Sequence, residues 1–224
     1  DRDRWEVISL PALAEEDDPL GRLPGEALCP ERYPKEELEH TRKIQGEYAF
    51  ASLYQQHPTV YEGSLWKRKW FTGRYEDLGD AYRLPNGRSW KKEACWYFGF
   101  MDPAGGISEQ ADHTALGFFA VTPARDLLVT WTTRARVAFE EIPRWLLDHS
   151  LAHKCNWIGI ESGFLQNSII RAARALPGMP ALKGCPGNVK GSKLAHSYPA
   201  MIEAENGRLL LPREAPWLDL LLTE

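Results

Sequence analysis

The stretch Cys95-Trp-Tyr-Phe-Gly-Phe-Met-Asp102 is a continuous apolar run that ends on an acid, and it decides the fold. A short run of this kind, bounded by turn residues, is typical of a buried strand. A second apolar run, Trp157-Ile-Gly-Ile-Glu161, ends in the same way. Both carboxylates therefore fall at the carboxyl ends of strands, where a chain can hold an acid rigidly and still leave it in contact with water.

Further strands and helices follow from the pattern around these two runs. Strands are expected near 112–121, 126–133 and 207–212, and helices near 138–153, 165–176 and 217–224. Three antiparallel strands followed by alternating helices and strands is the ribonuclease H-like order, whereas a doubly wound nucleotide-binding fold alternates from the start. We therefore expect an α/β protein with a ribonuclease H-like mixed sheet.

The N-terminal quarter of the chain has a different character. Its expected elements are a strand over 5–10, a loop over 15–34, and two short helices over 35–45 and 48–56 that are joined at Gly46. Further on, Asn86-Gly87 is a strong hairpin-turn signal. We expect a small helical appendage over residues 1–60 and the main α/β domain over residues 61–224.

Composition and charge narrow the class of protein. Hydrophobic residues make up 43% and charged residues 26% of the 224 residues, as in ordinary globular proteins. The net charge of -4 excludes binding of nucleic acid by bulk charge alone, but a nuclease can be acidic because its metal-binding carboxylates count in the total. The four cysteines have no C-x-x-C spacing, which favours buried free thiols in a reducing cytosol over a zinc site. The sequence contains no run of about 18 apolar residues, so no membrane-spanning helix is predicted.

Asp102 and Glu161 are candidate catalytic residues and metal ligands. Mg²⁺ takes few carboxylates, several waters and substrate phosphate oxygens. Two ions about 3.5–4 Å apart can activate water and stabilise the leaving oxygen of a phosphodiester. Asp112 returns near Asp102 if the first two main strands form a hairpin, so it is the third candidate. For each acid the alternative is a structural role at a turn or helix end, and the pattern alone does not decide between them.

Two basic segments are candidate DNA contacts. Lys190-Gly-Ser-Lys193 forms a basic loop that enters a helix, where charge and main-chain amides can hold a phosphate. Lys67-Arg-Lys69 lies between two tryptophans. For this segment we favour a solvated surface beside core aromatics over a surface that binds the DNA backbone. No Walker A loop, nucleophile elbow or dinucleotide fingerprint occurs, so nucleophilic side-chain catalysis has no support.

Several motifs occur in the order in which they occur in the large terminase subunits of tailed bacteriophages, which this chain resembles over essentially its whole length. The motifs are Trp5-Glu-Val-Ile-Ser-Leu, Leu20-Gly-Arg-Leu-Pro-Gly-Glu, Phe50-Ala-Ser-Leu-Tyr-Gln-Gln-His-Pro, Phe100-Met-Asp-Pro-Ala, Ala111-Asp-His-Thr, Ile160-Glu-Ser-Gly-Phe-Leu-Gln, Lys190-Gly-Ser-Lys-Leu-Ala and Asn206-Gly-Arg-Leu-Leu-Leu-Pro. The resemblance implies that residues 1–60 are the tail of a packaging ATPase with its lid, and that residues 61–224 are a ribonuclease H-like nuclease domain.

The same resemblance implies an activity and partners. A large terminase subunit pumps DNA with its ATPase half and cuts concatemeric viral DNA with its nuclease half, in the cytoplasm of the host bacterium. By this resemblance Asp102 and Glu161 are the first two metal-binding acids, Asp112 closes the loop after the first, and Lys193 lies in the loop beside the site. It further implies two Mg²⁺ or Mn²⁺ ions, double-stranded DNA as substrate, the small terminase subunit and the capsid portal as partners, and no membrane.

The chain departs from the family pattern at one important place. The family's third acid lies in an Asp-Asp pair, and neither Asp219 nor Glu224 has that context. We therefore expect a nuclease domain that is incomplete at its C-terminal end. The alternative is a non-catalytic DNA-binding or motor-interaction fragment whose metal site is incomplete. A more distant alternative is a sugar-kinase-like ATPase, but Asp102-Pro-Ala-Gly-Gly is a poor match to the glycine-rich phosphate loop that it needs.

Overall fold

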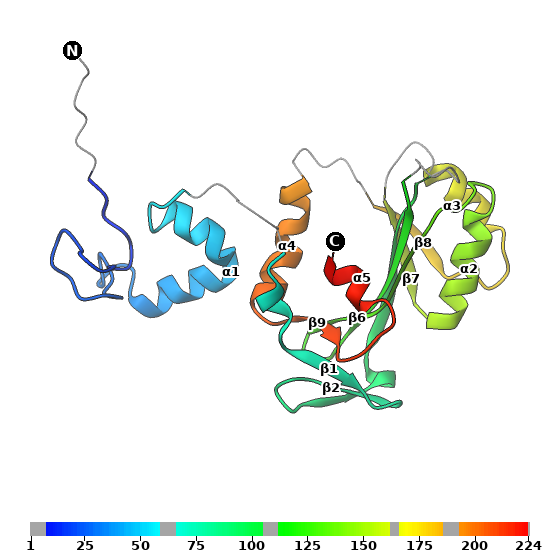
Figure 1. Ribbon diagram of the computed structural model, residues 1–224, viewed down its shortest axis with the longest axis horizontal. Coiled ribbons are helices and arrows are strands. Elements are labelled where there is room, and N and C mark those ends of the chain that lie inside the picture. Colours follow the sequence, from blue (N-terminus) through cyan, green and yellow to red (C-terminus); the bar gives the residue numbers. More distant parts are fainter. Residues whose placement is uncertain (1–7, 59–65, 105–111, 162–165, 186–192, 224) are drawn as a thin grey trace, which may run out of the picture. The chain divides into compact units, whose positions relative to one another are not determined.

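The computed structural model describes residues 8–58, 66–104, 112–161, 166–185 and 193–223 (Figure 1). The chain divides into two compact units, one made of Asp1–Lys67 with Tyr198–Asn206 and the other of Arg68–Ser197 with Gly207–Glu224. The boundary that the sequence places after residue 60 lies outside the described residues. None of the helices in the described part is long and apolar enough to cross a membrane.

The second unit is built on one mixed sheet. Its strands within the described residues are β1 (Arg74–Asp77), β2 (Ala81–Arg83), β3 (Ser89–Lys91), β4 (Trp96–Asp102), β5 (Thr114–Val121), β6 (Leu127–Ala135), β7 (Trp157–Glu161), β8 (Ala181–Cys185) and β9 (Leu209–Pro212). Their order is β3-β2-β1-β9-β6-β5-β4-β7-β8. Strands β4, β5 and β6 are antiparallel neighbours, and β7 and β8 continue from β4 as parallel strands. This is the ribonuclease H-like arrangement that the sequence predicts.

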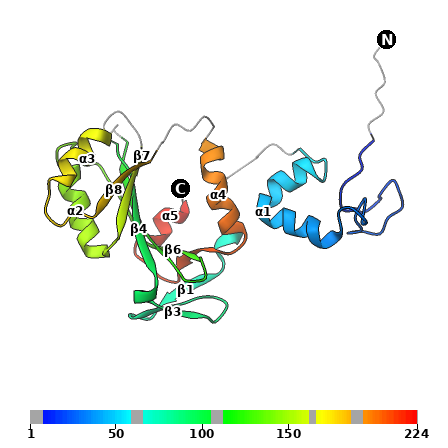
Figure 2. The same cartoon turned by 180° about the vertical axis from the view of Figure 1, so that it is seen from behind.

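Helices lie on both sides of this sheet. The helices of the described part are α1 (Lys35–Leu53), α2 (Ile142–His153), α3 (Gln166–Arg174), α4 (Lys193–Glu205) and α5 (Leu218–Thr223), with short 3-10 turns at η1 (Arg68–Phe71) and η2 (Lys92–Ala94). Helices α2 and α3 cover one face of β4, β5, β7 and β8, and the short α5 lies over the opposite face (Figures 1 and 2).

The face under α2 and α3 carries the main core. Alternate residues of the strands, among them Met101, Phe118 and Ile160, are 0–2% exposed and pack against Ile142 of α2 and Ile169 of α3. The opposite face of β4 is only half-buried, because α5 has six residues and covers part of it. The expectation of a buried strand therefore holds fully for one face of β4 and partly for the other.

Two strand glycines let phenylalanine rings lie against the half-buried face. A Cβ at Gly159 would lie 2.8 Å from Cδ2 of Phe100, and one at Gly117 would lie 3.0 Å from Cζ of Phe119. Both distances are shorter than ordinary carbon contacts, so only glycine leaves room for these rings. The ring of Phe119 also stacks on that of Phe98, with centroids 5.0 Å apart.

Two polar side chains fix the ends of the central strands. The main-chain N–H of Asn156 donates to the Tyr97 carbonyl (2.9 Å) and its Oδ1 accepts from the Tyr97 N–H (3.0 Å), which sets the register of β7 against β4. At the other end of β4, the fully buried Oγ1 of Thr114 donates to the Ala104 carbonyl (2.7 Å) and accepts from the Ala104 N–H (3.1 Å). These bonds extend the pairing of β4 and β5 beyond the last residue of β4.

The first unit is helical, as the sequence predicts. Helix α1 is broken at Gly46, whose φ of 78° and ψ of 158° are not helical. The expected strand over 5–10 is wrong for its described part: residues 8–10 are irregular, and the Leu10 N–H donates to Oε1 of Gln56 instead of a neighbouring strand. Buried Gln55 bonds both main-chain groups of Leu13 at 2.9 Å and so ties the N-terminal loop to α1.

Smaller differences from the sequence-based expectations concern single elements. The turn at Asn86-Gly87 joins β2 and β3 as predicted. Strand β8 was not predicted, and the segment around Arg68 forms the turn η1 with a buried Trp70. The cysteines are free, but Cys29 is exposed, so the expectation of buried thiols is wrong there.

Candidate functional site

The two leading acids leave the sheet side by side. Asp102 ends β4 and Glu161 ends β7, and the last ladder pair of these parallel strands joins Met101 to Ile160. The next position on each strand is an acid, and partners in a ladder point to the same face of a sheet. Neighbouring strands lie about 4.8 Å apart, so the structure places Asp102 and Glu161 at adjacent positions on one face of the sheet.

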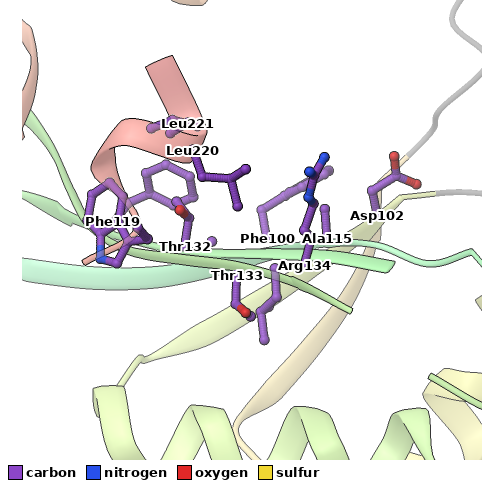
Figure 3. A pocket seen from close by; sticks show the side chains of 12 residues that line it. Phe100, Asp102, Ala115, Phe119, Thr132, Thr133, Arg134, Leu220 and Leu221 are labelled. Atoms are coloured by element: carbon purple, nitrogen blue, oxygen red, sulfur yellow. The ribbon is translucent and has the colours of Figure 1, made fainter. Parts of the chain in front are cut away.

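The acids stand in a row that crosses the sheet. Asp102 pairs with Ala115, which pairs with Arg134 of β6, and on the other side Glu161 pairs with Cys185 of β8. Asp102 and Arg134 rise from the same face, whereas Thr133 points to the opposite face (Figure 3). Sequence reasoning missed Arg134 and Cys185, because only strand register places them beside the acids.

The surroundings of the acids suit a hydrated hard cation. Asp102 is exposed and Glu161 is partly buried, at the open end of the strands. Mg²⁺ keeps several of its waters and usually takes one or two carboxylates, so two acids with solvent on one side match its donor preference. The Cys185 thiol beside Glu161 is a softer donor, of the type that zinc takes more readily than magnesium does.

Asp112 lies at the same end of the sheet but outside the strands. It is exposed and precedes β5 by two residues, next to the point where Thr114 closes the strand pair. Within the described residues, no three His, Cys, Asp or Glu side chains gather closely enough to hold an ion. A role for Asp112 as third ligand therefore stays a prediction.

The basic segment is described only at its end. Lys190 lies outside the described residues, and Lys193 is the first residue of α4. The helix that the sequence predicts after this segment is therefore present. The contact of this segment with a phosphate stays a prediction.

A pocket opens beside Asp102, between the half-buried sheet face and α5 (Figure 3). Its volume is about 270 Å³. It is lined by Phe100, Asp102, Ala115, Leu116, Gly117, Phe119, Thr132, Thr133, Arg134, Trp217, Leu220 and Leu221. Most of this lining is apolar, and the charged groups Asp102 and Arg134 belong to the row that crosses the strand ends.

Two histidines that the sequence analysis did not single out lie on the other side of the sheet. His149 and His153 of α2 pack on the Trp131 ring with centroid distances of 4.7 and 4.6 Å. Burial lowers the pKa of both imidazoles. Because Trp131 belongs to the core under α2, these histidines do not face the acids.

Comparisons with known proteins give matches among solved structures. No protein-family model and no curated protein matches the chain. The large terminase nuclease of thermophilic phage G20c, solved with bound magnesium, is 14% identical, with 72% of this chain and 80% of that chain covered and a TM-score of 0.47. The nuclease domain of large terminase subunit gp2 of bacterial virus Sf6 is 11% identical, with the same coverage and TM-score.

A second kind of protein is also similar. RuvC of Thermus thermophilus is 15% identical, with 54% of this chain and 83% of that chain covered and a TM-score of 0.36. The G20c nuclease has been solved with zinc and with cobalt as well. The similar solved structures thus include nuclease domains of large terminase subunits, the class that the sequence motifs resemble.

Proposed function

We propose that this protein is a divalent-metal-dependent DNA endonuclease, the nuclease part of a phage DNA-packaging terminase. The observation that supports it most is the placement of Asp102 and Glu161 at adjacent positions of two parallel strands, on an open face of a ribonuclease H-like sheet. Two carboxylates in this arrangement are suited to a cation that also contacts a phosphodiester.

The acids and Arg134 have distinct parts in the proposed reaction, the hydrolysis of a DNA phosphodiester bond. The oxygens of Asp102 and Glu161 would hold Mg²⁺ or Mn²⁺, with Asp112 as a further ligand. When bound, such an ion lowers the pKa of water and offsets charge on the phosphate. Arg134 lies two strands from Asp102 on the same face, where its guanidinium can hold a neighbouring phosphate.

The proposal extends to substrate and partners. Lys190 and Lys193 would hold the DNA backbone by charge. Concatemeric viral DNA would be the substrate, and two metal ions would take part. In the packaging machine the small terminase subunit and the capsid portal would be the partners, in the cytoplasm of the host bacterium.

One observation favours a second candidate function. Within the described part of the chain no third ligand joins Asp102 and Glu161. A site with two acids can bind metal too weakly to work, and the protein would then bind DNA or the packaging motor without cutting. This candidate makes a different prediction, namely DNA binding that does not depend on a divalent ion.

Nicking of supercoiled plasmid in Mn²⁺ tests the endonuclease proposal. We expect Asp102→Asn and Glu161→Gln to abolish nicking while the urea midpoint stays near that of the wild type. Asp148→Asn is the matched control, because Asp148 is an exposed acid of α2, away from the row. Undiminished nicking by Asp102→Asn would exclude the proposed site, and calorimetry that shows DNA binding but no Mn²⁺ binding by the wild type would favour the second candidate.

A further inference from the structure

The pocket beside Asp102 has the size of a site for one small ring system. Its volume of about 270 Å³ is just below the range of about 300–1,000 Å³ that is common for sites of drug-sized ligands. The sheet face forms one side and α5 forms the other (Figure 3). A ligand that fits here is small.

The lining of the pocket is aromatic and rigid. The ring of Phe100 lies over Gly159, and the ring of Phe119 lies over Gly117 and stacks on Phe98. Because neighbouring atoms already fix these rings, a ligand that stacks on them loses little of the protein's conformational freedom. Trp217 and Leu220 of the α5 side supply the facing apolar wall.

The polar groups of the pocket indicate what the ring is attached to. Arg134 and Asp102 line the pocket and also belong to the row across the strand ends, and Thr132 adds a hydroxyl on the same side (Figure 3). A guanidinium recognises phosphate well, and Asp102 is a proposed ligand of the catalytic ion. An aromatic heterocycle joined to a phosphate matches this combination, and in a DNA-cutting protein that unit is a nucleotide.

We propose that this pocket takes one nucleobase of the DNA strand, unstacked from its neighbours, beside the phosphodiester held at Asp102 and Glu161. This inference rests on the proposed endonuclease function and specifies how its substrate is held. Stacking of a base on protein aromatics contributes about 1–3 kcal/mol. Extrusion of a base is least costly where the duplex is mismatched, damaged or already open. The protein therefore selects strands that are single or locally open.

Abasic scanning tests the proposal directly. Single-stranded oligonucleotides of one length, each with a tetrahydrofuran abasic unit at a different position, are compared by fluorescence anisotropy with Ca²⁺ in place of Mn²⁺, so that a hard cation can still bind at the acids. We expect one position to weaken binding by about 5- to 150-fold, the equivalent of one lost stacking contact, with small effects elsewhere. Equal effects at all positions would overturn the proposal.

A pair of matched variants locates the effect in the pocket. Leu220, which is 47% exposed, lines the pocket, whereas Leu151 of α2 is 56% exposed on the other side of the sheet. We expect Leu220→Asp to remove the position dependence and Leu151→Asp to leave it intact. If the position dependence persists in Leu220→Asp, or disappears in both variants, the assignment is overturned. It is also overturned if the protein binds thymidine monophosphate while strands show no position dependence, since a free nucleotide would then be the ligand.

The outcomes separate this inference from the proposed function. If plasmid nicking depends on Asp102 but abasic scanning is flat, the endonuclease stands and the base pocket is refuted. If nicking is absent but one position still dominates strand binding, the pocket stands as a nucleic-acid site and the cutting activity is refuted.

Discussion

Replacement of Gly159 by alanine tests how closely the half-buried face is packed. The new Cβ would lie 2.8 Å from Cδ2 and 3.1 Å from Cε2 of Phe100, and 3.0 Å from Sγ of Cys185. Because carbon atoms prefer about 3.5–4.0 Å, the Phe100 ring would have to move by roughly 0.7 Å or more. Overpacking of this kind costs about 1–3 kcal/mol. Restriction of the unfolded chain by alanine offsets about 0.4–1 kcal/mol of it. We therefore expect Gly159→Ala to lower the free energy of unfolding by about 0.5–2 kcal/mol.

The assay is urea unfolding, read as a double-mutant cycle. Phe100→Leu removes the ring that the new methyl group meets, so Gly159→Ala should cost less in that background, with a coupling of at least about 0.5 kcal/mol. Phe119→Leu is the control background, because Phe119 lies over Gly117 and not over Gly159. Wild-type stability of Gly159→Ala, or strict additivity with Phe100→Leu, would refute the reasoning.

Three further predictions concern the core, the pH dependence and the N-terminal loop. Ile160→Ala empties a fully buried position between β7 and its helices, so we expect a loss of about 2–5 kcal/mol in urea unfolding; a loss below about 1 kcal/mol would contradict this packing. Burial lowers the pKa of His149 and His153 from the ordinary 6.5, so the unfolded state binds more protons at low pH. The contribution of the two histidines to the free energy of unfolding should therefore be full above about pH 6.5 and be lost as pH drops through their folded-state pKa values. In thermal unfolding measured over a pH series, replacement of both His149 and His153 by phenylalanine should make the melting temperature depend less on pH. Gln55→Leu leaves both main-chain groups of Leu13 without their partner, at about 1–3 kcal/mol for each buried group, and hydrogen exchange should show lost protection of the Leu13 amide.

The sequence could predict the positions of Asp102 and Glu161 because the information is local. Each acid follows an apolar run that is confined to one strand, and such runs are visible without any knowledge of pairing. Arg134 and Cys185 could not be found in this way. Their place in the row depends on the register of three strand pairs, and a slip by one residue would turn each to the other face.

The misplaced elements have equally specific causes. Strand β8 escaped prediction because Ala181–Cys185 has one buried residue, Leu182, and so shows no clear alternation. The strand expected over 5–10 fails in its described part because a Gln56 side chain, far along the chain, takes the place of a neighbouring strand for Leu10. The helix break at Gly46 could be predicted from the sequence, because glycine adopts backbone conformations that other residues avoid.

The hydroxyl of Thr114 has a consequence for protein engineering. Its two hydrogen bonds with the main chain of Ala104 add a side-chain link between β4 and β5 just past the end of β4. The main chain two residues after Asp102 is therefore held by a side chain of the neighbouring strand. In any redesign of the acids, position 114 is a residue to leave unchanged, because valine would keep the shape of threonine but remove both bonds.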